Sequence, residues 1–153
     1  MLRQPAQTKM TEILLVDDNP ADTDLTSEVL ARSGWPSHIH AVTDGLEAIA
    51  FLRQEGKYSN ALLPDFVILD LNLPKKDGRS VLVEIKADPV LRKIPIAIFS
   101  TSKAREDIVR SYELGANCYV SKPGNLQDFI SAVTSIGEFW FGLAHLPRED
   151  NHE

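Results

Sequence analysis

The sequence has little cysteine, no surplus of basic residues and no long apolar run, and each shortage excludes a class of protein. With one cysteine, Cys118, among 153 residues, no internal disulfide can form. Because Cys118 lies in an apolar run, we interpret it as a small core residue rather than a reactive thiol. The formal net charge of −6 leaves no basic excess to displace the counterions of a nucleic acid. No apolar run approaches the ~20 residues that span a bilayer.

The amino-terminal residues, MLRQPAQTKMTE, are polar and lack the apolar segment of a secretory signal. Together with the single cysteine, this predicts a cytoplasmic protein that has neither a membrane nor a nucleic acid as a partner. The length suits one globular domain with a sizeable core. We expect a flexible tail over residues 1–11, a single domain over residues 12–146 and a second tail over residues 147–153.

Five short apolar runs alternate with segments of helical periodicity along the chain. This alternation predicts an α/β fold in which a doubly wound parallel sheet carries helices on both faces, joined by right-handed crossovers. We expect the strand order 2-1-3-4-5. The predicted strands span residues 13–16, 38–42, 65–69, 94–99 and 118–120.

Two of the predicted helices carry specific expectations. In the second, residues 46–54, we assign the core stripe to Leu46, Ile49 and Ala50. The last helix begins near Asn125 and is unusually long. Its apolar stripe comprises Leu126, Phe129, Val133, Ile136, Trp140 and Leu143, and further apolar residues, Ile130, Phe139, Phe141 and Leu146, lie off that stripe.

One helix against one sheet cannot easily bury both sets of apolar residues. Clustered exposed aromatic side chains usually mark an interface. The sequence therefore predicts a homodimer that forms through the carboxyl-terminal side, with Phe139, Trp140 and Phe141 in the contact.

Polar side chains follow four of the five predicted strands. Asp17 and Asp18 come after the first, Asp70 after the third, Ser100 after the fourth and Lys122 after the fifth. Strands one and three are neighbours at the switch point of such a sheet, so their carboxyl ends converge. Three close carboxylates repel one another unless a cation lies between them, and Mg²⁺ is the hard cation that suits them. Lysine and serine add donors for an anionic oxygen, so the pattern predicts a site that accepts a phosphoryl group.

These motifs resemble the receiver domains of two-component response regulators. The matching features are the Asp17-Asp18 pair, Asp70 in a D-x-N-x-P-x-x-D-G setting, Ser100, and Lys122 followed by proline. Their order and strand-end placement fit that family over about residues 12–138. The resemblance implies a flavodoxin-like receiver fold and a two-component signalling function.

The resemblance also implies a set of roles. Asp70 would accept a phosphoryl group from a histidine kinase, in a self-catalysed transfer followed by slow autodephosphorylation rather than as an enzyme with a separate substrate. Asp18 and Asp70 would bind Mg²⁺ together with the main-chain carbonyl of Asn72, and Asp17 would act largely through bound water. Ser100 and Lys122 would contact the phosphoryl oxygens.

Two further expectations come from the same family. Tyr119 would be the aromatic switch residue that changes rotamer on activation, working together with Ser100. The peptide bond between Lys122 and Pro123 is cis in relatives.

A narrower similarity points to one branch of the family. The long connection over residues 56–64, the LNLPKKDGR run and the terminal EFW segment look like the small regulators that partner phytochrome-type histidine kinases in cyanobacteria and other bacteria. This suggests a role in red-light signalling. After Glu138 only 15 residues remain, which are too few for a DNA-binding module, so we expect output through protein contacts.

Three other functions compete with a phosphorylated switch. A haloacid-dehalogenase-like phosphatase would need D-x-D after one strand, whereas Asp17 and Asp18 are adjacent. A flavodoxin-like cofactor binder would need a Ser-, Thr- and Gly-rich phosphate loop where this chain has acids. A receiver that is never phosphorylated would serve as a docking module, although every acidic and basic site residue is present. We find no metal-ligand spacing among the four histidines and assign them no role; they are His38, His40, His145 and His152.

Overall fold

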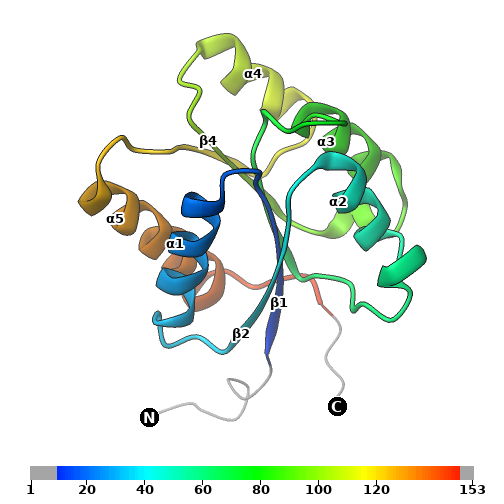
Figure 1. Cartoon of the computed structure of the whole chain (residues 1–153), viewed down its shortest axis with the longest axis horizontal. Coiled ribbons are helices and arrows are strands. Elements are labelled where there is room, and N and C mark those ends of the chain that lie inside the picture. The colour runs from blue at the N-terminus through cyan, green and yellow to red at the C-terminus, as the bar shows by residue number, and fades with distance from the viewer. Residues whose placement is uncertain (1–9, 149–153) are drawn as a thin grey trace.

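The computed structural model describes residues 10–148, which form a parallel five-stranded sheet between two layers of helices (Figure 1). The strand order is β2-β1-β3-β4-β5, so the predicted doubly wound fold is confirmed. The strands are β1 Thr11–Val16, β2 Ser37–Val42, β3 Phe66–Leu69, β4 Ile96–Ser100 and β5 Cys118–Ser121. The α-helices are α1 Pro20–Ala31, α2 Gly45–Leu52, α3 Gly78–Ala87, α4 Arg105–Glu113 and α5 Leu126–Gly137. Three short helices complete the order: η2 Gly56–Tyr58, η3 Leu91–Lys93 and η4 Glu138–Leu143.

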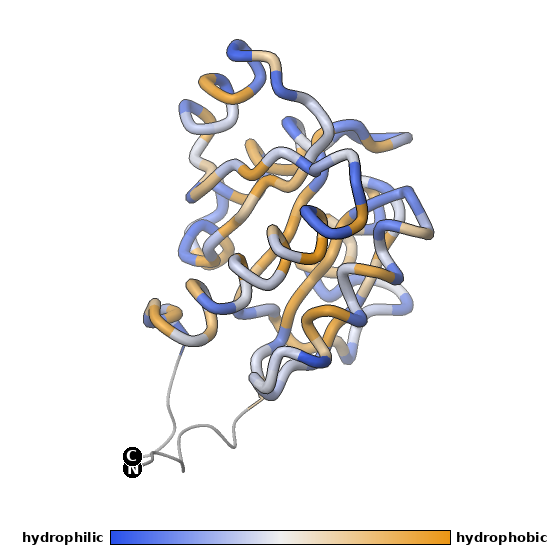
Figure 2. The backbone as a smooth tube through the Cα atoms, turned by 90° about the vertical axis from the view of Figure 1, so that its left-hand side faces the viewer, coloured by the Kyte–Doolittle hydropathy of each residue, from blue (hydrophilic) through white to orange (hydrophobic). Residues whose placement is uncertain are grey.

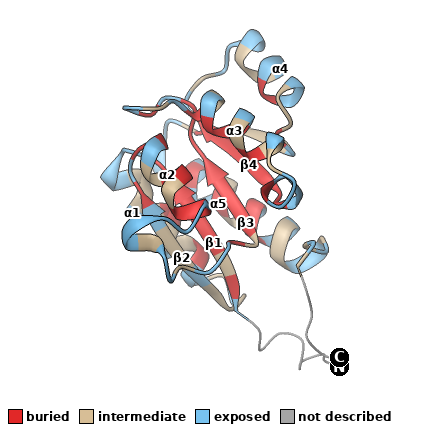
Figure 3. Ribbon diagram, turned by 90° about the vertical axis from the view of Figure 1, so that its right-hand side faces the viewer, coloured by how far each residue is buried: buried red, intermediate tan, exposed pale blue. Residues whose placement is uncertain are grey.

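The central strands are buried on both faces, as their continuous apolar runs predict. All four residues of β3 are buried, and β1 pairs with β3 in a register that places Leu15 beside Ile68. Helices α1 and α5 cover one face of the sheet, while α2 and α3 cover the other (Figure 3). Apolar segments accordingly run through the middle of the molecule and polar ones over its surface (Figure 2).

Side-chain caps set where the helices near the site begin. The Asn19 side chain accepts a hydrogen bond from the backbone N–H of Asp22 at 3.1 Å, with Pro20 at the first helical position. The Asp77 carboxylate accepts from the backbone N–H of Ser80 at 3.0 Å and starts α3. Both helices therefore begin directly after the polar loops that follow β1 and β3.

The core stripe predicted for α2 is wrong at Leu46, which is 52% exposed. The buried face instead includes Ala48, Ile49 and Leu52. Because Asp44 caps the helix and Gly45 is its first residue, positions 45, 48, 49 and 52 share the inner face at helical spacing. Leu46 falls outside that set.

The last helix changes form earlier than its apolar stripe predicts. The α-helical part ends at Gly137, and the chain continues as one π-helical segment, η4. The predicted stripe is exposed at both ends, where Leu126 and Leu143 are 63% and 73% exposed. Because a π-helical turn is wider than an α-helical one, the aromatic residues of η4 point in other directions than a continuous α-helix would give them.

Two of the three aromatic residues expected at a dimer contact pack within their own domain. The centroid of the Phe66 ring lies 5.1 Å from the ring centroid of Trp140 and 5.5 Å from that of Phe141. Leu146 is also partly buried against the same core. Only Phe139 of the three is exposed, at 49%. Trp140 and Phe141 are therefore partly buried within their own domain, and the contact of the aromatic cluster with a partner stays a prediction.

The boundaries expected for the two tails shift slightly where they can be compared with the structure. Thr11, assigned to the first tail, begins β1, and its backbone N–H donates to the carbonyl of Pro36 at 3.0 Å. Arg148, assigned to the second tail, contacts Asp65 at 3.2 Å. The remaining tail residues, 1–9 and 149–153, lie outside the described part of the chain. Within residues 10–148, no helix is both long enough and apolar enough to cross a membrane.

Candidate functional site

The site lies at the carboxyl ends of the strands, and backbone hydrogen bonds fix its members there. The N–H of Asp17 donates to the carbonyl of Val42 at 3.1 Å, and the N–H of Asp70 donates to that of Val16 at 3.0 Å. The N–H of Lys122 donates to the carbonyl of Ser100 at 2.7 Å. Asp17, Asp70 and Lys122 are thus each the first residue past a strand, and Ser100 is the last residue of β4, so their positions follow from the sheet register.

One ammonium group forms the centre of the site. Lys122 Nζ donates to Asp17 Oδ2 at 2.7 Å, to Asp22 Oδ2 at 2.9 Å and to Asp70 Oδ2 at 3.0 Å. The side chains of Lys122 and Asp17 are 3% exposed and that of Asp70 is 10% exposed. Three carboxylates from three segments of the chain therefore converge on one buried cation.

Burial and charge act in opposite directions on these groups. Burial alone lowers the pKa of Lys122, but its hydrogen bonds to Asp17 and Asp22 and the charge of Asp70 more than offset this, and the net direction is upward. Burial raises the pKa of Asp17, and the bond from Lys122 offsets only part of that shift. The lysine is firmly cationic, while burial makes the Asp17 carboxylate costly to keep ionised.

The acidic cluster also suits a divalent metal ion. Carboxylate oxygens of Asp17, Asp18 and Asp70 lie within 4.8 Å of one another, two from buried residues and one from the exposed Asp18. Hard oxygen donors with one side open to solvent fit a cation that keeps part of its water shell, such as Mg²⁺. These three residues would hold the ion. Asn72 lies in the loop just after Asp70, and the role of its carbonyl stays a prediction.

The proposed switch residues lie on neighbouring strands, Ser100 at the end of β4 and Tyr119 within β5. Ser100 is fully buried. The Tyr119 hydroxyl donates to the carbonyl of Ser102 at 2.8 Å, and burial raises the pKa of this partly buried phenol. Tyr119 is thus anchored to the loop after β4, but its change of rotamer stays a prediction. The bond between Lys122 and Pro123, which is cis in relatives, is not cis here, since residues 10–148 contain no cis peptide bond.

The loop after β3 depends on a glycine. A Cβ added to Gly78 would lie 2.1 Å from the carbonyl oxygen of Asp70, far inside van der Waals contact. The Gly78 N–H donates to the carbonyl of Leu71 at 2.7 Å, which holds the loop against the end of the strand. The Asp-Gly pair therefore keeps the backbone of α3 close to Asp70.

Asp22 is the site residue that the sequence analysis missed. It lies in the first turn of α1, three residues after the Asn19 cap, and its carboxylate contacts Lys122. A signal was present, because a helix that begins directly after β1 directs its first turn toward the same edge of the sheet. An acid in that turn also suits the helix dipole, and this ordinary explanation makes its contact with Lys122 hard to foresee.

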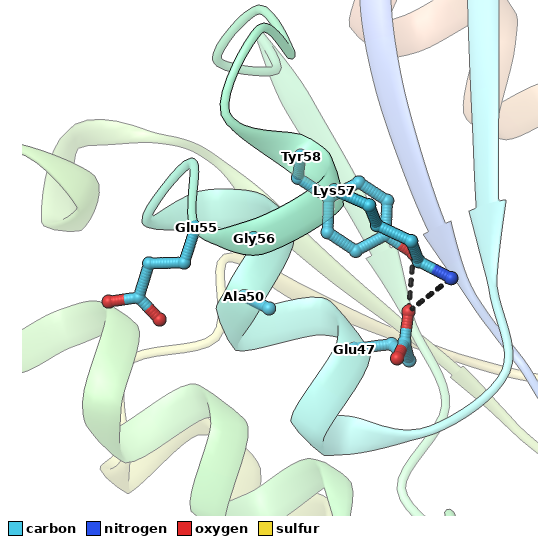
Figure 4. Close-up of a pocket in the computed structure, with 6 residues that line it drawn as sticks. All are labelled: Glu47, Ala50, Glu55, Gly56, Lys57 and Tyr58. Carbon is cyan, nitrogen blue, oxygen red and sulfur yellow. Dashed lines mark hydrogen bonds and ion pairs between the residues drawn. The ribbon is translucent and has the colours of Figure 1, made fainter.

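The long connection after α2 forms a separate feature. The Tyr58 hydroxyl donates to the Glu47 carboxylate, and Lys57 Nζ lies 3.5 Å from the same carboxylate (Figure 4). These three residues, with Ala50, Glu55 and Gly56, line an open pocket of about 430 Å³. None of the predicted site residues lines this pocket.

Comparison with known proteins decides the family. The profile of the response regulator receiver domain matches residues 13–134. The chain belongs to the response regulator receiver family. This confirms the resemblance found in the sequence, and it sets aside the phosphatase and flavin-binding alternatives.

Similar response regulators are known from cyanobacteria. The chain is 47% identical over 135 residues to response regulator Rcp1 of Synechocystis sp., covering 88% of this chain and 92% of the relative. A structure of the phosphorylated cyanobacterial phytochrome response regulator RcpA is 51% identical, with a TM-score of 0.89 over 92% of this chain and all of that chain. The Mn²⁺-bound form of Rcp1 is 46% identical, with a TM-score of 0.88 over 90% of this chain and 99% of that chain.

Proposed function

We propose that this response regulator accepts a phosphoryl group on Asp70 in a Mg²⁺-dependent reaction. The observation that supports the proposal is the convergence of Asp17, Asp22 and Asp70 on Lys122 Nζ at 2.7–3.0 Å. This cluster combines an acceptor carboxylate, a fixed cation and a set of metal-binding oxygens. Such a combination suits transfer of a dianionic group.

The transfer exchanges one bond to phosphorus for another. The bond from phosphorus to a histidine nitrogen of the kinase breaks as an Asp70 carboxylate oxygen bonds to phosphorus, which yields an acyl phosphate. Lys122 stays within reach of the phosphoryl oxygens, and Ser100 supplies a hydroxyl donor. A bound Mg²⁺ would neutralise charge on the transferring group. Because the chain supplies the acceptor, the lysine and the hydroxyl and would hold the Mg²⁺ ion, transfer and slow hydrolysis of the product need no separate enzyme.

We further propose that the phosphoryl donor is a phytochrome-type histidine kinase. The similarity to Rcp1 and to the phytochrome response regulator RcpA extends over about nine-tenths of this chain. Because such a kinase uses ATP, we propose that both proteins act in the cytoplasm. Signal output then runs through protein contacts.

A homodimer through the carboxyl-terminal side is also part of the proposal, with a revised contact. Phe139 and Leu143 are 49% and 73% exposed on η4, and Ile130 on α5 is 37% exposed. Trp140 and Phe141 support this surface from beneath, because they pack on Phe66. A two-fold contact would bury the same apolar residues on both chains.

The decisive test is intact-protein mass after incubation with acetyl phosphate and Mg²⁺. We expect one added phosphoryl group on the wild type and on the matched control Asp24→Asn, which removes an exposed acid from α1. We expect none on Asp70→Asn. No addition to the folded wild type would leave a docking module. Addition to Asp70→Asn would identify a different acceptor.

A further inference from the structure

A second cluster of metal-binding side chains lies at the opposite end of the sheet from Asp70. Glu12 on β1 pairs in register with His38 on the edge strand β2, and His40 follows two residues later. Because alternate residues of a strand point to the same face, both imidazoles lie on the face that carries Glu12. Figure 1 shows the two strands side by side at the edge of the sheet.

The donor atoms of this cluster lie at distances that suit a metal ion. Glu12 Oε1 is 3.3 Å from His38 Nδ1 and 3.8 Å from His40 Nε2, and donors of all three residues lie within 4.8 Å of one another. A tetrahedral zinc ion with bonds of about 2.1 Å separates its ligand atoms by about 3.4 Å. A cation therefore fits among the three donors after small side-chain rotations.

One oxygen of the carboxylate at the centre of the cluster accepts no hydrogen bond within the described residues. Glu12 Oε1 is buried, and within residues 10–148 no donor satisfies it. Its side chain is 15% exposed, whereas those of His38 and His40 are 56% and 37% exposed. An unsatisfied buried carboxylate oxygen is costly, and a bound cation would remove that cost. The more exposed imidazoles leave a path to solvent.

The orientation of the cluster is supported by its neighbours. The ring of His40 lies 5.1 Å from that of Phe51 on α2, and the two imidazole rings lie 4.6 Å apart. The Glu12 N–H donates to Asp65 Oδ2 at 2.8 Å, which fixes the backbone from which the carboxylate projects. Two of the three ligands are therefore held before a metal arrives.

We propose that Glu12, His38 and His40 form a binding site for a divalent transition metal such as Zn²⁺. Two imidazoles and one carboxylate favour such ions over Mg²⁺, which prefers oxygen donors alone. Three protein ligands leave at least one coordination position for water or for a donor from another molecule. Glu12 precedes Asp17 by five residues of extended chain, so the Cα atoms of these two residues lie about 16 Å apart.

The test is isothermal titration with Zn²⁺ on the full chain, with Mg²⁺ in large excess to occupy the aspartate cluster. Wild type and Asp70→Asn should both bind one Zn²⁺. The double variant His38→Gln/His40→Gln should bind at least about tenfold more weakly, and Glu12→Gln should also weaken binding. The matched control His145→Gln, which removes an exposed histidine elsewhere, should bind as the wild type does.

Two readouts separate this site from the aspartate cluster. Co²⁺ should give the visible absorption of a tetrahedral site in Asp70→Asn and lose it in the double histidine variant. Urea midpoints of all the variants, measured without metal, check that folding is intact. Equal Zn²⁺ affinity in the wild type and the double histidine variant would overturn the proposal, as would loss of the bound Zn²⁺ in Asp70→Asn alone.

Discussion

Replacement of Lys122 by methionine tests the electrostatic balance of the site. The substitution keeps the length and apolar stem of the side chain but removes the charge. Asp17, Asp22 and Asp70 then lose the one cation that all three contact. We expect the folded state to lose stability in the absence of a divalent metal and to regain it when Mg²⁺ is added.

The magnitude follows from burial. Removing one partner of a buried ion pair typically costs 3–5 kcal/mol, because the remaining charge stays unpaired. Asp22 is 25% exposed and is partly solvated. Asp17, whose pKa burial already raises, can bind a proton. Both effects favour the lower end of that range, so we expect the free energy of unfolding to fall by about 3 kcal/mol near pH 7. Mg²⁺ at a hundred times its dissociation constant would restore about 2.7 kcal/mol.

The assay is urea unfolding of wild type and Lys122→Met, each with EDTA and with Mg²⁺. Lys103→Met is the matched control, because it removes an exposed lysine and should change stability by less than about 0.5 kcal/mol. Mg²⁺ should stabilise Lys122→Met more than it stabilises the wild type. Lowering the pH should also narrow the gap between them, since protonation removes the repulsion among the carboxylates.

Two results would refute this reasoning. If Lys122→Met with EDTA is as stable as the wild type, the three carboxylates do not depend on the lysine for compensation. If it is destabilised but equally so with and without Mg²⁺, the loss comes from packing rather than from charge.

Three further predictions concern other parts of the molecule. Gly78→Ala should destabilise the fold by about 2–3 kcal/mol in urea unfolding, because its Cβ would clash with the Asp70 carbonyl; an unchanged midpoint would contradict the close approach. Burial and the Glu47 carboxylate raise the pKa of Tyr58 to about 12, so its contribution to stability is complete below pH 10 and lost as pH rises through 12. Ultraviolet titration should show that phenol ionising at lower pH in Glu47→Gln, and an unchanged midpoint would count against the contact. The proposed homodimer should be seen for the wild type in sedimentation velocity and should dissociate in Phe139→Asp at unchanged folding; a monomeric wild type or a dimer that persists in the variant would contradict the proposed contact.

The sequence predicts the sheet and its polar edge well because both depend on local pattern. Continuous apolar runs mark buried strands, and Asp17, Asp70 and Lys122 each stand directly after one. Parallel pairing then brings these strand ends together. Caps such as Asn19 locate helix starts for the same local reason.

What the sequence does not predict depends on distant contacts or on helical phase. Leu46 belongs to an apolar segment, but the start of α2 at Gly45 turns it outward. Trp140 and Phe141 find their partner in Phe66, more than 70 residues earlier, so no local pattern shows that they are covered.

The sequence does not predict the proposed metal-binding cluster for a similar reason. The spacing of His38 and His40 suits one face of a strand, but the third ligand lies on β1, and only the register of the sheet brings it near. Spacing along the chain is therefore a poor guide when the ligands come from two paired strands.

The two ends of the described chain meet beside the start of the sheet. Arg148 Nη1 lies 3.1 Å from Thr11 Oγ1 and 3.2 Å from Asp65 Oδ2. A short linker can therefore join residues 148 and 11 in a circular permutant, with new termini opened in the exposed loop near Asn60. Fluorescent proteins or a surface tether attached directly before Thr11 or after Arg148 would leave from the side opposite Asp70. Such fusions should let a kinase reach the aspartate without obstruction.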